Sequence, residues 1–71
     1  MRFPLQELQD IVGAIAKGSA LDITYRNHRL FGEWTGCYEC HVRPDLLLIY
    51  RIREKECVVE LLRLGSHAEL F

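Results

Sequence analysis

The sequence has no long hydrophobic run, few cysteines and no basic surplus. Its longest uninterrupted apolar stretch is Leu46–Tyr50, whereas a membrane-spanning helix needs about 20 apolar residues. We therefore expect no membrane contact. The first residues carry no hydrophobic region behind a basic start, so we also expect no secretion signal. Three cysteines without such a signal are typical of free thiols in the reducing cytoplasm, where we expect the chain to reside.

The net charge at pH 7 is −1, although domains that bind nucleic acid usually carry an excess of Lys and Arg. Overall charge therefore gives no support for RNA binding, which has to depend on local clusters of residues. Apolar residues make up 49% of the chain and charged residues 27%, which is a globular composition. A chain of 71 residues has room for one small core, so we treat residues 1–71 as a single domain.

Residues 4–17 have the apolar period of a helix. Residues that recur every three or four positions form one apolar stripe, which consists of Leu5, Leu8, Val12 and Ile15. Pro4 suits the first position of this helix, and Gly18 suits the left-handed residue that ends it. A stripe of this width has to pack against another element, and a sheet formed by the rest of the chain is the only candidate.

The remainder of the chain predicts an antiparallel sheet. After a connector at 19–28, alternating and apolar segments separated by turn residues indicate strands. The expected strands lie at 29–34, 37–42, 46–52 and 57–64. The third of them is nearly all apolar, so we expect it to be central and buried on both faces. The predicted fold is therefore α+β, with one helix packed on a three- to four-stranded antiparallel sheet.

Cys37 and Cys40 form a C-x-x-C motif, which in other proteins indicates zinc binding or redox activity. In a strand, residues three apart point to opposite faces, so these two thiols diverge. The sequence has no second C-x-x-C to complete a set of four ligands. We therefore predict that both cysteines are buried apolar side chains, and that the protein uses no metal or other cofactor.

The three histidines are predicted to meet at one edge of the sheet. His28 precedes the first strand, His41 lies near the end of the second, and His67 follows the last. In an antiparallel meander these positions lie at the same end of the sheet. Asp45 and Arg63 are expected at that end as well.

This set of residues suits cleavage of a phosphodiester by the neighbouring 2′-hydroxyl, which requires a base, an acid and a cation but no metal. Imidazoles exchange protons near neutral pH, a carboxylate orients an imidazole, and an arginine neutralises phosphate charge. Strand alternation also places His41 on the same face as Glu39, so that face is either exposed to solvent or lines a cleft. For each histidine taken alone, an ordinary surface position is the alternative.

Three separated stretches resemble the YafQ branch of the RelE/ParE toxin superfamily. They are YRNHRLFGEWTG at 25–36, ECHVRPDLLLIYRI at 39–52 and LLRLGSHAELF at 61–71. The resemblance implies a bacterial type II toxin: a small ribonuclease that cleaves messenger RNA in the ribosomal A site by attack of the 2′-hydroxyl, without a metal. It also implies a cognate antitoxin that wraps the toxin and blocks its active site.

The resemblance further implies which residues form the site. The positions that match the family's active site are His28, His41, Asp45, Arg63, His67 and Phe71. We expect His67 to accept the proton of the 2′-hydroxyl and Arg63 to stabilise the charged phosphorane. His28 or His41 is expected to protonate the leaving 5′-oxygen, and Asp45 to orient an imidazole.

Three residues are predicted to bind the substrate: Phe71, Arg43 and Arg51. Phe71 offers a ring on which a splayed-out base stacks, or an anchor for the chain end. The chain departs from the family in two ways. It has Leu46 where the family carries Trp, and family chains begin with a strand and a helix ahead of the helix at 4–17. We expect impaired activity from the first departure and an uncovered sheet edge from the second.

Two alternatives to a ribonuclease remain open. A shortened toxin without catalytic activity would still bind an antitoxin, or itself, through the uncovered sheet edge. A gyrase-directed toxin of the ParE type is less favoured, because such toxins do not need a histidine-rich edge. Arrested translation, complex formation without toxicity, and DNA damage distinguish the three.

Overall fold

The computed structural model describes residues 4–56 and 58–70 of the chain. A four-stranded antiparallel sheet with the strand order β1-β2-β3-β4 forms its centre. The strands are β1 His28–Arg29, β2 Tyr38–Arg43, β3 Leu46–Arg53 and β4 Val58–Gly65. The helical elements are α1 Leu5–Ala16, the 3-10 turns η1 Ile23–Tyr25 and η2 Gly32–Trp34, and α2 His67–Leu70. The predicted α+β fold is confirmed.

Helix α1 packs against one face of the sheet through Ile11 and Ile15, which are 1% and 8% exposed. Burying side chains of this size stabilises the fold by roughly 1.5–3 kcal/mol each. Gly18, with a φ of 73°, ends the helix as predicted. The predicted stripe is partly wrong, because Leu5 is 54% exposed while Ile11, which the stripe omitted, lies at its centre. Leu8, Ile11 and Ile15 have the same three- and four-residue spacing, and they face the middle of the sheet.

The face of the sheet toward α1 supplies the rest of the core. Alternate residues of β2 and β3 line it, namely Cys40, Val42, Leu48 and Tyr50. The Tyr50 hydroxyl donates a hydrogen bond to Asn27 Oδ1 at 2.5 Å, and this bond ties the connector before β1 to the core. Burial raises the pKa of Tyr50 to about 12, so the hydroxyl keeps its proton at neutral pH. The bond thereby fixes the position from which His28 enters the sheet.

The first predicted strand, at 29–34, is wrong in length. β1 ends at Arg29, and the Leu30 N–H donates to the Cys37 carbonyl at 3.0 Å as the chain leaves the sheet. Gly32 and Gly36, with φ values of 68° and 90°, allow the segment between them to fold into η2 and project from the sheet. The other three predicted strands are confirmed to within one residue at each end that the structure describes.

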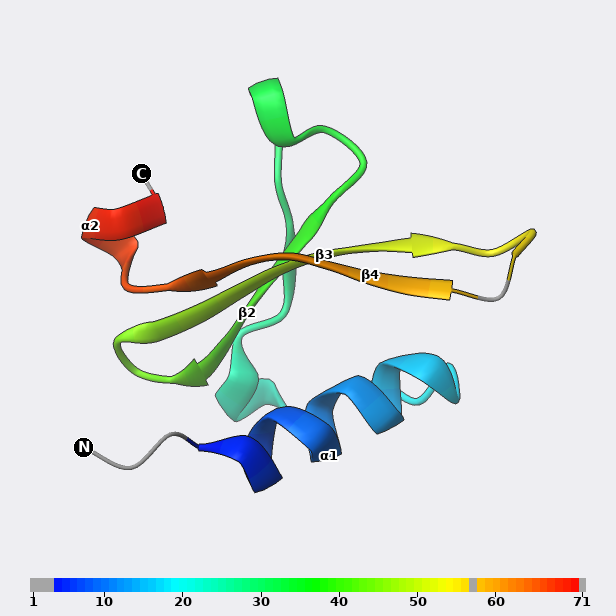
Figure 1. Ribbon diagram of the computed structural model, residues 1–71, viewed down its shortest axis with the longest axis horizontal. Helices are drawn as coiled ribbons and strands as arrows, with labels where there is room; N and C mark the ends of the chain where they lie inside the picture. Colours follow the sequence, from blue (N-terminus) through cyan, green and yellow to red (C-terminus); the bar gives the residue numbers. More distant parts are fainter. Residues whose placement is uncertain (1–3, 57, 71) are drawn as a thin grey trace.

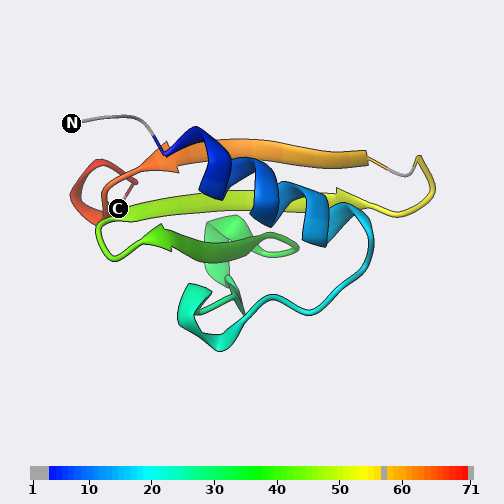
Figure 2. The same ribbon diagram turned by 90° about the horizontal axis from the view of Figure 1, so that it is seen from below.

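The two faces of the sheet are covered differently. Figure 1 shows α1 below the sheet, with α2 and the green loop that contains η2 above it. Figure 2, seen from below, shows α1 in front of the strands. We call the face away from α1 the open face, because α2 and the η2 loop flank it and no long helix of the described part of the chain covers it. Within residues 4–56 and 58–70, no helix is long and apolar enough to cross a membrane.

Candidate active site

Two rows of cross-strand neighbours run over the open face. The first row has one residue from each strand: His28, Glu39, Ile49 and Arg63. The second row lies two residues farther along each strand, nearer the β2–β3 turn, and consists of His41, Leu47 and Gly65. Neighbouring strands are about 4.8 Å apart, so the first row spans roughly 14 Å. The structure thus brings two of the predicted histidines and the predicted arginine to one face of the sheet.

Glu39 is buried in the first row and lies between two imidazoles. Its side chain is 7% exposed, and Oε1 is 3.4 Å from His28 Nε2 and 3.7 Å from His41 Nε2. Both distances exceed that of a good hydrogen bond, so the attraction is mainly between charges once an imidazole is protonated. A buried carboxylate is costly unless it is paired, and the two imidazoles supply its partners.

The two imidazoles differ in what their other nitrogen contacts. His28 Nδ1 is 2.8 Å from the carbonyl oxygen of Arg26. A carbonyl oxygen can only accept a hydrogen bond, so Nδ1 carries a proton and both ring nitrogens of His28 are engaged. Among the described residues, Nδ1 of His41 has no hydrogen-bond partner. His41 is therefore the imidazole with a nitrogen available to a substrate.

Arg63 lies at the other end of the first row, against Trp34 of η2. Its guanidinium carbon is 5.6 Å from the centre of the Trp34 ring, and Nη1 donates to the Leu62 carbonyl at 2.7 Å. The loop that contains η2 therefore reaches across the open face to β4. Ile49, the neighbour of Arg63 in the row, is fully buried there. The ring and the carbonyl together restrict the orientation of the guanidinium.

His67 is the first residue of α2, two positions beyond Gly65 of the second row. A capping box fixes the start of this short helix. The Ser66 N–H donates to Glu69 Oε1 at 2.8 Å, and the Glu69 N–H donates to the Ser66 hydroxyl oxygen at 3.3 Å. Hydrogen bonds from Ser66 hold the pKa of Glu69 below its usual value. The capping box places the backbone of His67 at the end of the sheet that carries the second row, which includes His41.

Neither Asp45 nor Arg43 forms an ion pair with Glu39, His28 or His41. Asp45 is exposed in the β2–β3 turn, whereas the carboxylate of Glu39 lies beside His28 and His41. Arg43 Nη2 is bound to Glu7 Oε1 of α1 at 2.8 Å. Phe71, for which stacking on a base was predicted, lies outside the described residues.

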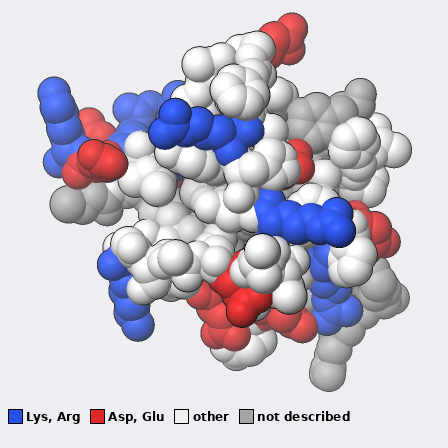
Figure 3. All heavy atoms as spheres, turned by 180° about the vertical axis from the view of Figure 1, so that it is seen from behind, with Lys and Arg blue, Asp and Glu red and all other residues white. Residues whose placement is uncertain are grey.

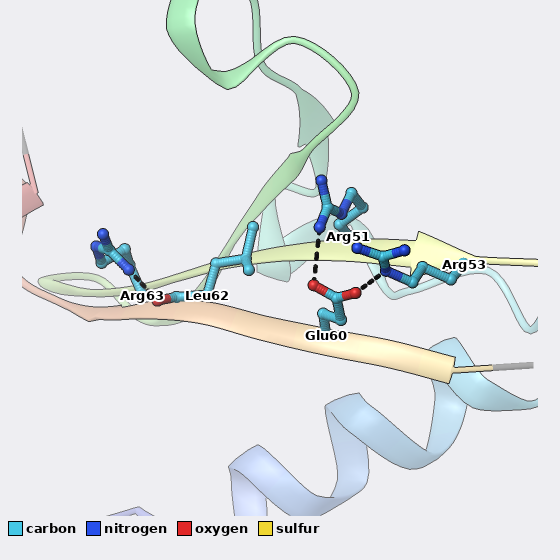
Figure 4. Close-up of polar contacts among 5 residues, drawn as sticks. All are labelled: Arg51, Arg53, Glu60, Leu62 and Arg63. Atoms are coloured by element: carbon cyan, nitrogen blue, oxygen red, sulfur yellow. Dashed lines mark hydrogen bonds and ion pairs between the residues drawn. The ribbon is translucent and has the colours of Figure 1, made fainter. Parts of the chain in front are cut away.

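Arg51 is also engaged elsewhere. It binds Glu60 of β4 at 2.9 Å, and Arg53 binds the same carboxylate. Figure 4 shows this cluster on the opposite side of Leu62 from the Arg63 guanidinium. Glu60 therefore neutralises part of the positive charge that was predicted to bind substrate. Of the three arginines predicted for the site, Arg43 and Arg51 are paired with carboxylates, and Arg63 contacts a ring and a carbonyl instead.

Glu39 and Trp34 are site residues that the sequence reasoning missed. Glutamates in strands usually face solvent, so the residue type alone does not mark Glu39 as part of a site. Strand alternation, which put it on the face of His41, was the available signal. Trp34 had no such signal, because the segment that contains it was predicted to be a strand.

The two cysteines of the C-x-x-C motif are free and buried, as predicted. Burial raises the pKa of the Cys40 thiol to about 11. A thiolate is the form that binds metal or acts as a nucleophile, so this environment disfavours both. In the part of the chain that the structure describes, no group of three or more His, Cys, Asp or Glu side chains is arranged to hold a metal ion.

The fold of this chain is similar to the solved structures of bacterial toxins. A metal-bound toxin from Helicobacter pylori aligns with a TM-score of 0.90 and 45% identity, over 97% of this chain and 77% of that one. The Escherichia coli DinJ-YafQ complex contains a chain that aligns with a TM-score of 0.83 and 31% identity, over 99% of this chain and 77% of that one.

The sequence also matches a family model along its whole length. The model is described as "Bacterial toxin of type II toxin-antitoxin system, YafQ", and it matches residues 1–71. The chain therefore belongs to the YafQ family. The mRNA interferase toxin YafQ of Escherichia coli K12 is 43% identical over 51 residues, which are 72% of this chain and 53% of that protein. The chain thus spans about half the length of the curated relatives that it matches.

Proposed function

We propose that this protein is a toxin endoribonuclease that cleaves messenger RNA on the ribosome by attack of a 2′-hydroxyl, without a metal. The observation that carries the proposal is the position of buried Glu39 between the imidazoles of His28 and His41, in the row of cross-strand neighbours that ends at Arg63. A carboxylate that lies against an imidazole holds the ring in position for proton transfer. The names of the relatives, an mRNA interferase among them, support the same reaction.

The geometry favours a particular assignment of roles. His67 accepts the proton of the 2′-hydroxyl, as the family resemblance implies, and Arg63 stabilises the charge that develops on the phosphorane. His41 protonates the leaving 5′-oxygen, because it has a ring nitrogen available and lies one strand nearer to Arg63 than His28 does. Glu39, and not Asp45, orients this imidazole.

The charge distribution is consistent with a substrate delivered by the ribosome. In Figure 3, Lys and Arg side chains occur at separate positions on the back of the molecule, with acidic side chains between them. A protein that grips free RNA usually carries a surplus of basic residues, whereas this chain has a net charge of −1 at pH 7. We therefore propose that the ribosome positions the messenger RNA and that the open face supplies the catalytic groups in the cytoplasm.

An antitoxin is the proposed protein partner. The DinJ-YafQ structures show a relative in a toxin–antitoxin complex. In this chain β4 is the last strand of the sheet, and Leu61 and Leu64 are 48% and 37% exposed beside Leu8, where they line an apolar groove of about 210 Å³. This groove also favours the second candidate function, a non-catalytic module that binds an antitoxin or a second copy through the β4 edge.

Induced expression tests the proposal. We expect the intact chain to arrest translation and produce cut messenger RNA, which primer extension detects. His67→Ala should relieve the arrest, whereas Lys55→Ala in the exposed β3–β4 turn should not. Normal growth with the intact chain, or equal toxicity of His67→Ala, would contradict the ribonuclease proposal. A harmless chain that forms a dimer or antitoxin complex by light scattering would support the binding module, and DNA damage would support a gyrase target.

A further inference from the structure

Part of the edge of β2 is not covered by β1. Pairing between these strands stops at His28 and Glu39. Arg26 has a left-handed backbone, with φ of 48°, and this conformation separates β1 from η1. The space between η1 and the end of β2 is a cavity of about 250 Å³. The residues that line it are Thr24, Arg26, His41, Arg43 and Pro44.

Among the described residues, the lining of this cavity is cationic and includes no carboxylate. Two acidic side chains bind lining residues, but neither lines the cavity. Glu7 binds Arg43 at 2.8 Å, and Asp22 accepts hydrogen bonds from the N–H and hydroxyl of Thr24, both at 2.9 Å. Within residues 4–56 and 58–70, the Arg26 guanidinium has no hydrogen bond or ion pair. Its five donors are therefore available to an anion.

We propose that this cavity binds a backbone phosphate of the RNA, next to the phosphate that is cleaved, with Arg26 as its principal ligand. The inference rests on the proposed ribonuclease function. His41 lines the cavity and also contacts Glu39 in the candidate site. A phosphate in the cavity is thus adjacent to one held at His41, as successive phosphates of a single strand are. A guanidinium binds phosphate through two parallel N–H bonds, so Arg26 would fix the register of the strand.

Substitution of Arg26 tests this cavity without removing the backbone contact between Arg26 and His28. The Arg26 carbonyl, which accepts the hydrogen bond from His28 Nδ1, belongs to the backbone and remains in Arg26→Ala. Arginine and alanine both have a Cβ atom, so the left-handed backbone is no more strained after the change. Arg29→Ala is the matched control. It removes an equal charge from β1, where the guanidinium lies 6.0 Å from the centre of the Tyr38 ring.

Inorganic phosphate is the first probe, titrated into the labelled full chain and followed by NMR. We expect phosphate to shift the Arg26 Nε–H, Thr24 and His41 resonances. Loss of this charge-assisted contact in Arg26→Ala should weaken phosphate binding about tenfold, and Arg29→Ala should leave it unchanged. Shifts confined to Arg63 and His67, or equal binding by Arg26→Ala, would overturn the inference.

A single-stranded RNA with 2′-O-methyl groups, which cannot be cleaved by 2′-hydroxyl attack, is the second probe. Each phosphate contact contributes about 0.7 to the slope of log affinity against log salt concentration. Arg26→Ala should lower the slope by that amount and Arg29→Ala should not. An unchanged slope in Arg26→Ala overturns the inference even if the chain binds inorganic phosphate. Cleavage by the wild-type chain in a translation extract tests the proposed function separately, so the two failures are distinguishable.

Discussion

Replacement of Glu39 by glutamine tests whether the buried carboxylate serves the reaction. At the observed 3.7 Å from His41 Nε2, a carboxylate and an imidazolium attract each other by about 4–5 kcal/mol at an effective dielectric constant near 20. Solvent at the part-exposed imidazole reduces the net value to about 1.5–3 kcal/mol, the lower part of the range measured for close pairs of opposite charge. Glu39→Gln should therefore lower kcat/KM for cleavage about 10- to 150-fold.

The same position should separate stability from activity. Glu39→Met removes the desolvation cost of the buried carboxylate, and the imidazoles of His28 and His41 that remain are 51% and 21% exposed, so neither is left as a buried unpaired charge. We therefore expect Glu39→Met to leave the free energy of unfolding in urea unchanged or raised, while cleavage falls at least as far as in Glu39→Gln. Glu54→Gln, which removes an exposed charge in the β3–β4 turn, is the control and should change neither quantity.

Two results would refute this reasoning. Wild-type cleavage by Glu39→Gln would show that the carboxylate has no part in proton transfer. A loss of more than about 2 kcal/mol of unfolding free energy in Glu39→Met would show that its contacts with His28 and His41 hold the fold together instead. Both variants are measured in one translation extract, with the cut messenger RNA counted by primer extension.

Three other changes give separate tests. Trp34→Leu removes the ring beside Arg63, and the lost cation–π contact of about 0.5–1 kcal/mol should lower kcat/KM two- to fivefold, with Trp34→Phe nearer to wild type. Because burial raises the pKa of Cys40 to about 11, iodoacetamide at neutral pH should label Cys40 only after denaturation, as mass spectrometry would show. The pKa of Glu69 is lower in the folded state than in the unfolded state. The stabilisation that Glu69 gives to the cap of α2 is therefore complete above its unfolded pKa, and it is lost as the pH falls through its folded pKa. The Ser66 amide resonance should therefore titrate in acid in the wild type and stay constant in Glu69→Ala.

The sequence was sufficient to predict the elements whose signal is local. Helix α1 follows from apolar periodicity and from Gly18, and β2, β3 and β4 follow from apolar segments separated by turn residues. The first predicted strand failed because two glycines with positive φ let the chain fold away from the sheet, which alternation of residue type does not reveal.

Prediction of the candidate site depended on whether the contacts follow from strand order. A meander necessarily puts the start of β1 and the end of β2 together, so the grouping of His28 with His41 could be predicted. Ion pairs between distant segments could not. Glu7 binds Arg43 across 36 positions of sequence, and only the packing of α1 on the sheet brings the two together.

Leu46 bears on whether the chain is active. It begins β3 on the face toward α1 and packs against the core cluster that contains Leu48 and Tyr50. An aromatic ring at this position would extend the core, whereas Trp34 supplies a ring on the open face beside Arg63. We therefore expect Leu46→Trp to lower the free energy of unfolding by about 1–3 kcal/mol, because the larger ring overpacks the core. The value of kcat/KM should stay within about twofold of wild type. A tenfold rise in cleavage by Leu46→Trp, with an unchanged midpoint of unfolding in urea, would show that a ring at this position reaches the RNA.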